Sequence, residues 1–141
     1  MAGTGSAGIR LSPFGVFNDM PDYDAMATDY AYLTDRLSAL GLLYLHIVDH
    51  SAMGAPKVPD SMKQTMRRLF QGAIILSGGY DAARAQHDID AGKGDLVAVG
   101  RDFLANPDLP ARWHNGTALN QPDFDTFYTP GPKGCTDYPA M

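Results

Sequence analysis

Short apolar runs alternate along this chain with longer segments that repeat apolar residues at helical spacing. Four runs predict strands, and the last three are nearly continuously apolar, which is typical of parallel strands buried on both faces. These runs span residues 9–12, 42–48, 73–77 and 96–99. The pattern therefore predicts a parallel sheet.

Helix-like segments separate and follow these runs. Residues 22–40 carry an apolar stripe at three- and four-residue steps, which predicts an amphipathic helix. A second helix is expected to begin at Asp60 or Ser61, because either side chain can serve as an N-cap. Asp81 is expected to cap a third helix, and residues 101–105 form a short helical run.

Strands that alternate with helices imply parallel pairing and right-handed crossovers. Two architectures fit this order: a small doubly wound sheet, or four consecutive units of a (β/α)8 barrel. Barrel enzymes often bind phosphate with the loops after strands seven and eight. Gly78-Gly79 and Gly100-Arg101 follow the last two predicted strands. In the barrel interpretation, these strands would be the seventh and eighth.

Composition narrows the class of protein. With 141 residues and 45% hydrophobic content, the chain has the size and apolar content of one domain. A net charge of −5 without a basic stripe argues against nucleic acid as a partner. No apolar run approaches the ~20 residues that span a bilayer, and no secretory signal is recognisable. We therefore expect a cytoplasmic protein that does not enter a membrane.

Cysteine and histidine offer little metal-binding potential. Cys135 is the only cysteine, so no intrachain disulfide and no multi-cysteine metal site can form. His46 and His50 are four residues apart in a segment that resembles a strand. That spacing places both on one face only if the strand continues through Asp49. No metal site is expected.

Residues 96–107 carry the clearest candidate chemistry. A strand stops at Gly100, Arg101 follows, and a helix begins at once. Glycine lets a ligand approach the backbone, and a guanidinium supplies charge and paired donors, so an anionic group such as phosphate suits this turn. An ordinary βα turn with a surface arginine explains the same residues.

Several motifs occur in a recognisable order. They are Gly8-Ile9-Arg10-Leu11-Ser12-Pro13-Phe14-Gly15, Tyr44-Leu45-His46, Ser77-Gly78-Gly79-Tyr80, residues 100–109 and Thr136-Asp137-Tyr138-Pro139. Together they resemble the old yellow enzyme family of NADH:flavin oxidoreductases, which are FMN-dependent ene-reductases. The resemblance runs from about Gly8 to Met141, and it covers only the C-terminal half of the family's TIM (β/α)8 barrel, about strands 5–8.

The resemblance implies a flavin site. FMN would be reduced by NADH or NADPH and would pass hydride to a small activated alkene. Arg10 would lie beside the flavin's pyrimidine edge, where a cation stabilises negative charge on the reduced ring. Gly78, Gly79 and Gly100 would offer backbone donors to the FMN phosphate, and Arg101 would pair with that phosphate.

The chain departs from the family pattern in its catalytic residues. The substrate-anchoring pair, the proton-donor tyrosine and the first flavin-contacting strand all precede Arg10 in the family's order, so we expect no catalytic residue in this chain. Cys135 stands where the family often has an aromatic residue at the mouth of the active site. It could open the mouth or place a thiol there, but the simpler explanation is a small neutral replacement, because a lone cysteine is usually inert unless its environment activates it.

Three segments are expected: a flexible lead-in at residues 1–8, a (β/α)4 half-barrel at 9–106, and a tail at 107–141 packed on the barrel. A half-barrel should pair with a complementary N-terminal half-barrel chain or with itself, because open sheet edges and exposed apolar surface favour association. The alternative is a non-catalytic fragment that binds FMN or another phosphate ligand.

Overall fold

The computed structural model describes residues 6–17, 19–20 and 22–141. The chain divides into two compact units, Met1–Ala98 and Val99–Met141. The sequence pattern placed the end of the half-barrel at residue 106, whereas the division between the units falls eight residues earlier. The packing of the tail on the barrel stays a prediction. No helix in the described ranges is long and apolar enough to cross a membrane.

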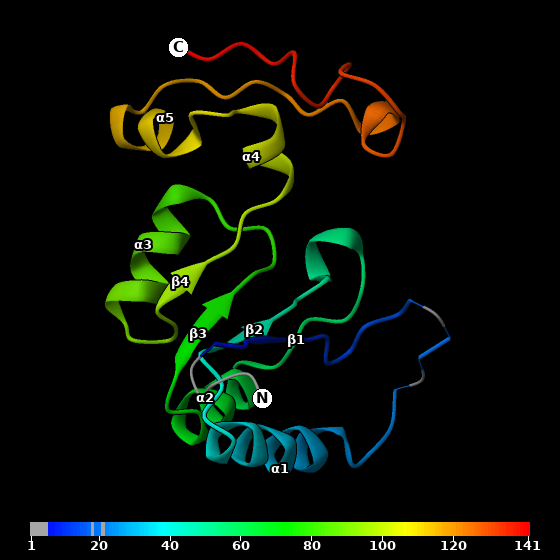
Figure 1. The fold of residues 1–141 in the computed structure, drawn as a ribbon, viewed down its shortest axis with the longest axis vertical. Helices are drawn as coiled ribbons and strands as arrows, with labels where there is room; N and C mark the ends of the chain where they lie inside the picture. The colour runs from blue at the N-terminus through cyan, green and yellow to red at the C-terminus, as the bar shows by residue number, and fades with distance from the viewer. Residues whose placement is uncertain (1–5, 18, 21) are drawn as a thin grey trace. The chain divides into compact units, whose positions relative to one another are not determined.

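The first unit is built on a four-stranded sheet (Figure 1). Its strands are β1 (Ile9–Leu11), β2 (Tyr44–Ile47), β3 (Ala73–Leu76) and β4 (Leu96–Val97). All pairs are parallel, and the spatial order is β1-β2-β3-β4, the same as the order along the chain. A doubly wound sheet reverses its strand order at a switch point. The observed order lacks that reversal and is the order of a barrel segment, which decides between the two predicted architectures.

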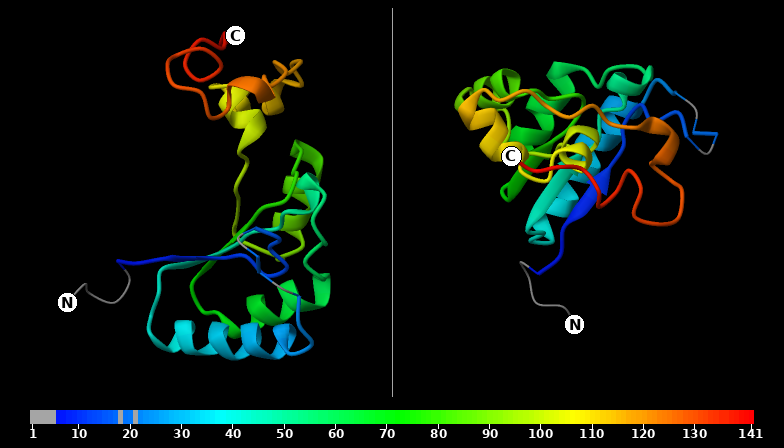
Figure 2. Two further views of the ribbon diagram at one scale, coloured as in Figure 1. Left: turned by 90° about the vertical axis from the view of Figure 1, so that its right-hand side faces the viewer. Right: turned by 90° about the horizontal axis from the view of Figure 1, so that it is seen from above.

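Three helices of the first unit cover one face of this sheet. They are α1 (Met26–Ala39), α2 (Asp60–Leu69) and α3 (Ala82–Asp90). Right-handed crossovers between successive neighbouring strands place every helix on the same side, and Figures 1 and 2 show α1 and α2 together along one side of the strands. The buried core includes Leu45, Ile47, Ile74 and Leu76 from the strands, with Leu37, Met62, Met66 and Phe70 from α1, α2 and the residue after α2.

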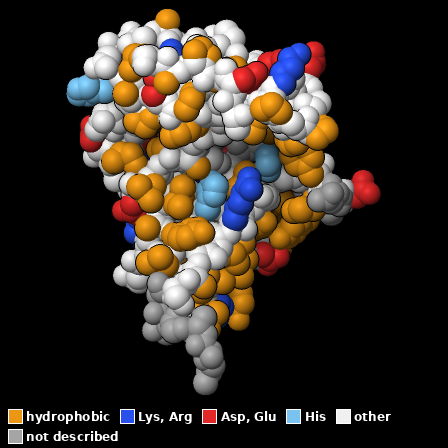
Figure 3. Space-filling view, turned by 45° about the horizontal axis from the view of Figure 1, so that its top comes forward, with side chains coloured by type: hydrophobic (Ala, Val, Ile, Leu, Met, Phe, Trp, Pro, Cys, Tyr) orange, Lys and Arg blue, Asp and Glu red, His pale blue; other side chains and the backbone are white. Residues whose placement is uncertain are grey.

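The opposite face of the sheet is not covered to the same extent. Side chains alternate along a strand, so the residues between the core positions point to this face. Tyr44 is 37% exposed and Leu96 is 55% exposed. The prediction that the strand beginning at Leu96 is buried on both faces was therefore wrong, because the Leu96 side chain is exposed on this face. Figure 3 shows hydrophobic side chains at the molecular surface, with basic and histidine side chains among them.

The helix boundaries follow local chemistry. Asp81 caps α3 as predicted, since its side chain accepts a hydrogen bond from the Arg84 N–H at 2.8 Å. The predicted cap of α2 was wrong, because Pro59 occupies the N-cap position and makes no side-chain cap bond. Asp60 is instead the first helical residue, where a carboxylate interacts favourably with the helix dipole.

The second unit contains α4 (Arg101–Ala105), α5 (Leu109–Asn115) and a 3-10 turn, η2 (Phe124–Thr126). The short helix at 101–105 was predicted, whereas α5 was not, because prolines surround it. Buried Arg112 links α5 to the segments that follow it in this unit. Its guanidinium donates to the Asp108 carboxylate at 2.7 Å, to the Ala118 carbonyl at 2.7 Å and to the Pro139 carbonyl at 3.0 Å.

Candidate functional site

The Gly78-Gly79 turn follows the C-terminal end of β3. Parallel α/β folds bind ligands at this end of their strands. Gly78 has φ +118° and Gly79 has φ +66°, conformations that side-chain-bearing residues rarely adopt. Within the described part of the chain, the N–H groups of Gly78, Gly79 and Tyr80 have no hydrogen-bond partner. The turn therefore presents successive unpaired donors, an arrangement that suits an anion.

A buried ion pair supports the turn from the β2 side. Asp49 follows β2, and its carboxylate accepts hydrogen bonds from Lys63 Nζ at 2.6 Å and from the Ser51 N–H at 3.0 Å. A Cβ atom at Gly78 would lie 2.9 Å from the Cβ of Asp49, so only glycine fits against this carboxylate. Burial by itself raises the pKa of Asp49, but the bonds from Lys63 and Ser51 outweigh it and leave the pKa below its ordinary value.

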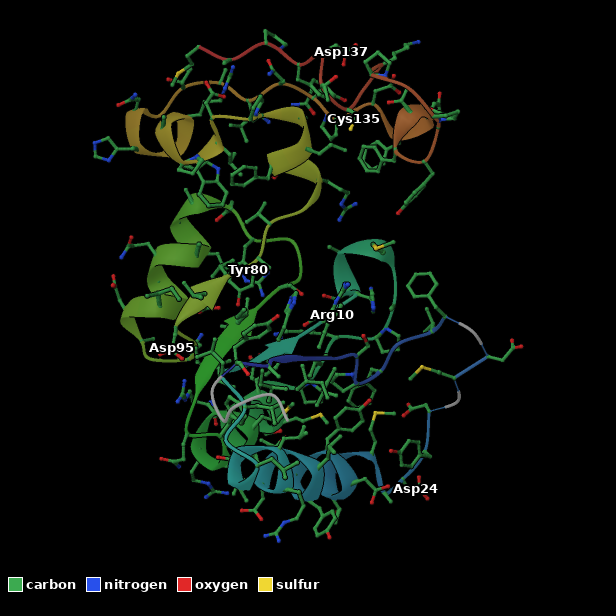
Figure 4. The ribbon with its side chains drawn as sticks, viewed as in Figure 1. Arg10, Asp24, Tyr80, Asp95, Cys135 and Asp137 are labelled. Atoms are coloured by element: carbon green, nitrogen blue, oxygen red, sulfur yellow. The ribbon has the colours of Figure 1, made fainter. Side chains whose placement is uncertain are left out.

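Arg84 supports the turn from the α3 side. Its Nη1 lies 2.7 Å from the carbonyl oxygen of Gly78 and 3.4 Å from that of Gly79. The guanidinium stacks on the ring of Tyr80 at 4.0 Å. Figure 4 marks Tyr80 at this turn, after β3. The turn is thus held by side chains from two elements rather than by its own backbone.

The Asp88 carboxylate lies next to Arg84 and is bound by several polar side chains. This buried carboxylate accepts hydrogen bonds from Lys93 Nζ at 2.6 Å and from the Tyr80 hydroxyl at 2.9 Å. Burial opposes its charge, but the bonds from Lys93, His87 and Tyr80 lower its pKa overall. Burial, together with the hydrogen bond to Asp88, raises the pKa of Tyr80 to about 12. At neutral pH, Tyr80 is therefore a neutral donor and Asp88 a charged acceptor.

Arg10 lies in the middle of β1 and is exposed. It is in register with His46 of β2, which is itself in register with Ile75 of β3, so these three side chains share the uncovered face. Arg10 is labelled on β1 in Figure 4. Burial, and secondarily the charge of Arg10, lowers the pKa of His46. Its Nε2 is buried without a hydrogen-bond partner among the described residues.

Gly100, Arg101 and Cys135 belong to the second unit. Gly100 and Cys135 both line a hollow of about 610 Å³, together with Phe103, Leu104 and Tyr138. Arg101 is the first residue of α4, and its guanidinium lies 5.9 Å from the ring centroid of Phe124. Cys135 is an exposed free thiol. The structure brings Gly100 and Cys135 together, and it places Arg10, Gly78 and Gly79 in the other unit.

Sequence reasoning missed the side chains that hold the glycine turn. Asp49, Lys63, Arg84 and Asp88 were not singled out, although Arg84 and Asp88 are four residues apart in the helix predicted after Asp81. That spacing is a recognisable signal for side chains on one helical face. Lys63 and Asp49 lie on different elements, so no local pattern could have paired them. No group of three or more potential metal ligands occurs in the described ranges.

Known proteins resemble the chain over nearly its whole length. The model of the NADH:flavin oxidoreductase / NADH oxidase family matches residues 1–120. The 12-oxophytodienoate reductase 1 of Oryza sativa subsp. japonica is 42% identical over 144 residues, which cover 99% of this chain and 37% of that protein. A 12-oxophytodienoate reductase-like protein of Solanum lycopersicum is 40% identical over 141 residues, with the same coverage of each chain.

Solved structures agree with these relatives. Morphinone reductase superposes with a TM-score of 0.88 at 43% identity, over 95% of this chain and 36% of that one. The chain therefore spans just over a third of the length of the proteins it matches. The family match, the identities near 40% and the shared parallel βα architecture lead to one conclusion: the chain belongs to the old yellow enzyme family of NADH:flavin oxidoreductases, and its sheet corresponds to half of a (β/α)8 barrel.

Proposed function

We propose that this chain supplies the phosphate-binding end of an FMN site in an NAD(P)H-dependent ene-reductase. The observation that carries the proposal is the Gly78-Gly79 turn at the C-terminal end of a parallel strand, in a member of a flavin-dependent family. Its N–H groups have no hydrogen-bond partner among the residues that the structure describes. Unpaired backbone donors are costly to leave without an acceptor. A phosphate dianion is an acceptor that satisfies several of them at once.

The residues of the chain fit FMN chemically. Gly78, Gly79 and Gly100 lack side chains that would keep a phosphate from the backbone, and Arg101 supplies a guanidinium that can bind two phosphate oxygens. Arg10 would offer a cation to the flavin ring from the uncovered face of the sheet. Bound FMN would supply hydride transfer from NADH or NADPH to an activated alkene. Relatives named as reductases of 12-oxophytodienoate and morphinone are consistent with that class of reaction.

The complete activity requires more of the barrel than the sheet described here. The proteins that the chain matches are almost three times as long. The exposed apolar residues Tyr44 and Leu96 lie on one face of the sheet together with His46, whose buried Nε2 has no partner within the described ranges. Buried polar atoms normally find a partner, so this face suits a complementary half-barrel. A second copy of the chain is the alternative occupant, and it would give an assembly that binds a phosphate ligand without catalysis.

Flavin binding can be tested directly with the full chain. We expect FMN fluorescence to change on titration and riboflavin, which lacks the phosphate, to bind at least about tenfold more weakly. Arg101→Gln should reduce FMN affinity, while Arg36→Gln, an exposed arginine of α1, serves as the control. No spectral change at high micromolar FMN would exclude flavin binding by the chain. Equal affinity for FMN and riboflavin would exclude a phosphate site.

Assembly and activity need a second experiment. The N-terminal part of a relative, ending where the match to this chain begins, can be mixed with the chain and FMN. Oxidation of NADPH in the presence of cyclohexenone should then appear only when both parts are present. Sedimentation of the chain by itself distinguishes a monomer from a self-assembled dimer. A complex without activity would favour the non-catalytic alternative, and the absence of a complex would contradict the complementary half-barrel.

A further inference from the structure

We propose that Arg84 is a positioning residue for the phosphate turn. By holding the carbonyl oxygens of Gly78 and Gly79 toward α3, it turns the N–H groups of Gly79 and Tyr80 to the opposite side, where they form a preset donor pair for a phosphate. The inference rests on the proposed function, because the phosphate in question is that of FMN. Arg84 itself does not contact the ligand.

The glycine turn needs an external support. Two successive glycines reach the required positive φ values of +118° and +66° without steric cost, but the same freedom lets them adopt many other conformations. Packing constrains the turn on one side only, where Cβ atoms at Gly78 and Gly79 would lie 2.9 Å from the Cβ atoms of Asp49 and Ala52. These contacts limit where the backbone lies and do not orient its peptide planes.

Arg84 supplies the missing orientation. In a trans peptide, the C=O and the following N–H point in opposite directions. The Gly78 carbonyl faces Arg84 Nη1 at 2.7 Å, so the Gly79 N–H points away from α3. Arg84 Nη1 also contacts the Gly79 carbonyl, at a longer distance of 3.4 Å, so the Tyr80 N–H likewise points away from α3. A cation on the carbonyl side also polarises each peptide and strengthens its N–H as a donor.

The guanidinium of Arg84 is itself held in place. It lies over the ring of Tyr80 at 4.0 Å, and its Nε is 4.0 Å from the Asp88 carboxylate. Asp88 is anchored by Lys93 at 2.6 Å and by the Tyr80 hydroxyl at 2.9 Å. The backbone of Arg84 is fixed as well, because its N–H binds the Asp81 cap. Each of these contacts limits the rotamers of Arg84, so the turn is preorganised before a ligand arrives.

The test compares Arg84→Met, Arg84→Lys and the control Arg68→Met, an exposed arginine of α2, in the full chain. Fluorescence titration measures affinity for FMN and for riboflavin. Amide NMR spectra of the ligand-free chain follow the Gly79 and Tyr80 signals. Loss of one charge-assisted hydrogen bond corresponds to about a tenfold loss of affinity or more.

We expect Arg84→Met to weaken FMN binding about tenfold while riboflavin binding and the urea midpoint stay near those of the control. The Gly79 and Tyr80 signals should broaden or split in the free variant. Arg84→Lys should recover part of the FMN affinity, because one ammonium can bind the Gly78 carbonyl but cannot span both carbonyls. Equal losses for FMN and riboflavin, or unchanged amide signals in Arg84→Met, would overturn the positioning role.

A second probe distinguishes a wrong flavin site from a wrong role for Arg84. If the wild-type chain binds no FMN, inorganic phosphate serves as the probe in the same NMR experiment. Shifts of the Gly79 and Tyr80 signals with phosphate that disappear in Arg84→Met would retain the role of Arg84 and reject the flavin site. The absence of any shift in the wild type with either probe would reject both.

Discussion

Replacing Lys63 by methionine should destabilise the protein far more than an ordinary surface substitution. The Nζ atom of Lys63 lies 2.6 Å from Asp49 Oδ2, and the two side chains are only 11% and 1% exposed. At that distance, an effective dielectric of about 20 gives roughly 6 kcal/mol of gross attraction, most of which offsets desolvation. Methionine keeps the length of the side chain and leaves the Asp49 carboxylate buried without its cation.

Removing one member of a buried pair costs about 3–5 kcal/mol. For a chain of this size, the loss corresponds to a drop in midpoint temperature of roughly 10–17 °C. Urea unfolding followed by circular dichroism measures the change in the free energy of unfolding. The matched control is Lys57→Met, since Lys57 pairs with Asp60 at 3.1 Å but both side chains are more than half exposed. Its expected cost is below about 1 kcal/mol.

The pH dependence of this loss checks its cause. Lys63 makes the largest contribution that lowers the pKa of Asp49, so this pKa should be higher without Lys63 than in the wild type. The carboxyl then takes up a proton more readily as the pH falls, and the penalty should shrink with falling pH. The double variant with Asp49→Asn should regain much of the stability, because no buried charge remains. A loss equal to that of Lys57→Met, or a loss that does not change with pH, would refute the reasoning.

Two further predictions concern the same region. Gly78→Ala should lower the free energy of unfolding by at least about 1 kcal/mol more than Gly92→Ala, because both have positive φ but only Gly78 faces a neighbour at 2.9 Å, whereas a Cβ at Gly92 meets open space. Paired urea titrations measure the difference, and equal losses would contradict the steric account. Stability should also fall with acid. The pKa values of Asp49 and Asp88 are lowered in the folded state, so their contribution is present above the unfolded value near pH 4 and is lost as the pH falls through the folded values. Asp88→Asn should flatten this dependence between pH 5 and 2, and an unchanged slope would exclude Asp88 as a source.

The local sequence pattern was enough to predict most of the strands and helices. Apolar runs that alternate with amphipathic segments predicted four parallel strands and the helices between them, and Asp81 marked the start of α3. The paired glycines after the third strand marked a turn where the structure has positive φ at Gly78 and Gly79, whereas Gly100, after the fourth strand, has φ −97°. The order of several motifs was specific enough to indicate the family that the comparisons establish.

Other features depend on contacts between residues distant in sequence. The choice between a doubly wound sheet and a barrel segment rests on strand order, which no single strand encodes. The pairing of Lys63 with Asp49 joins a helix to a strand end, and the exposure of Leu96 depends on what lies against its face. Helix α5 forms although prolines surround it, since Arg112 binds carbonyls from the following segment. The residue types and their spacing indicated which turns were candidates for binding an anion. Only the tertiary structure decided which side chains contact the Gly78-Gly79 turn, because packing selects partners that sequence proximity does not.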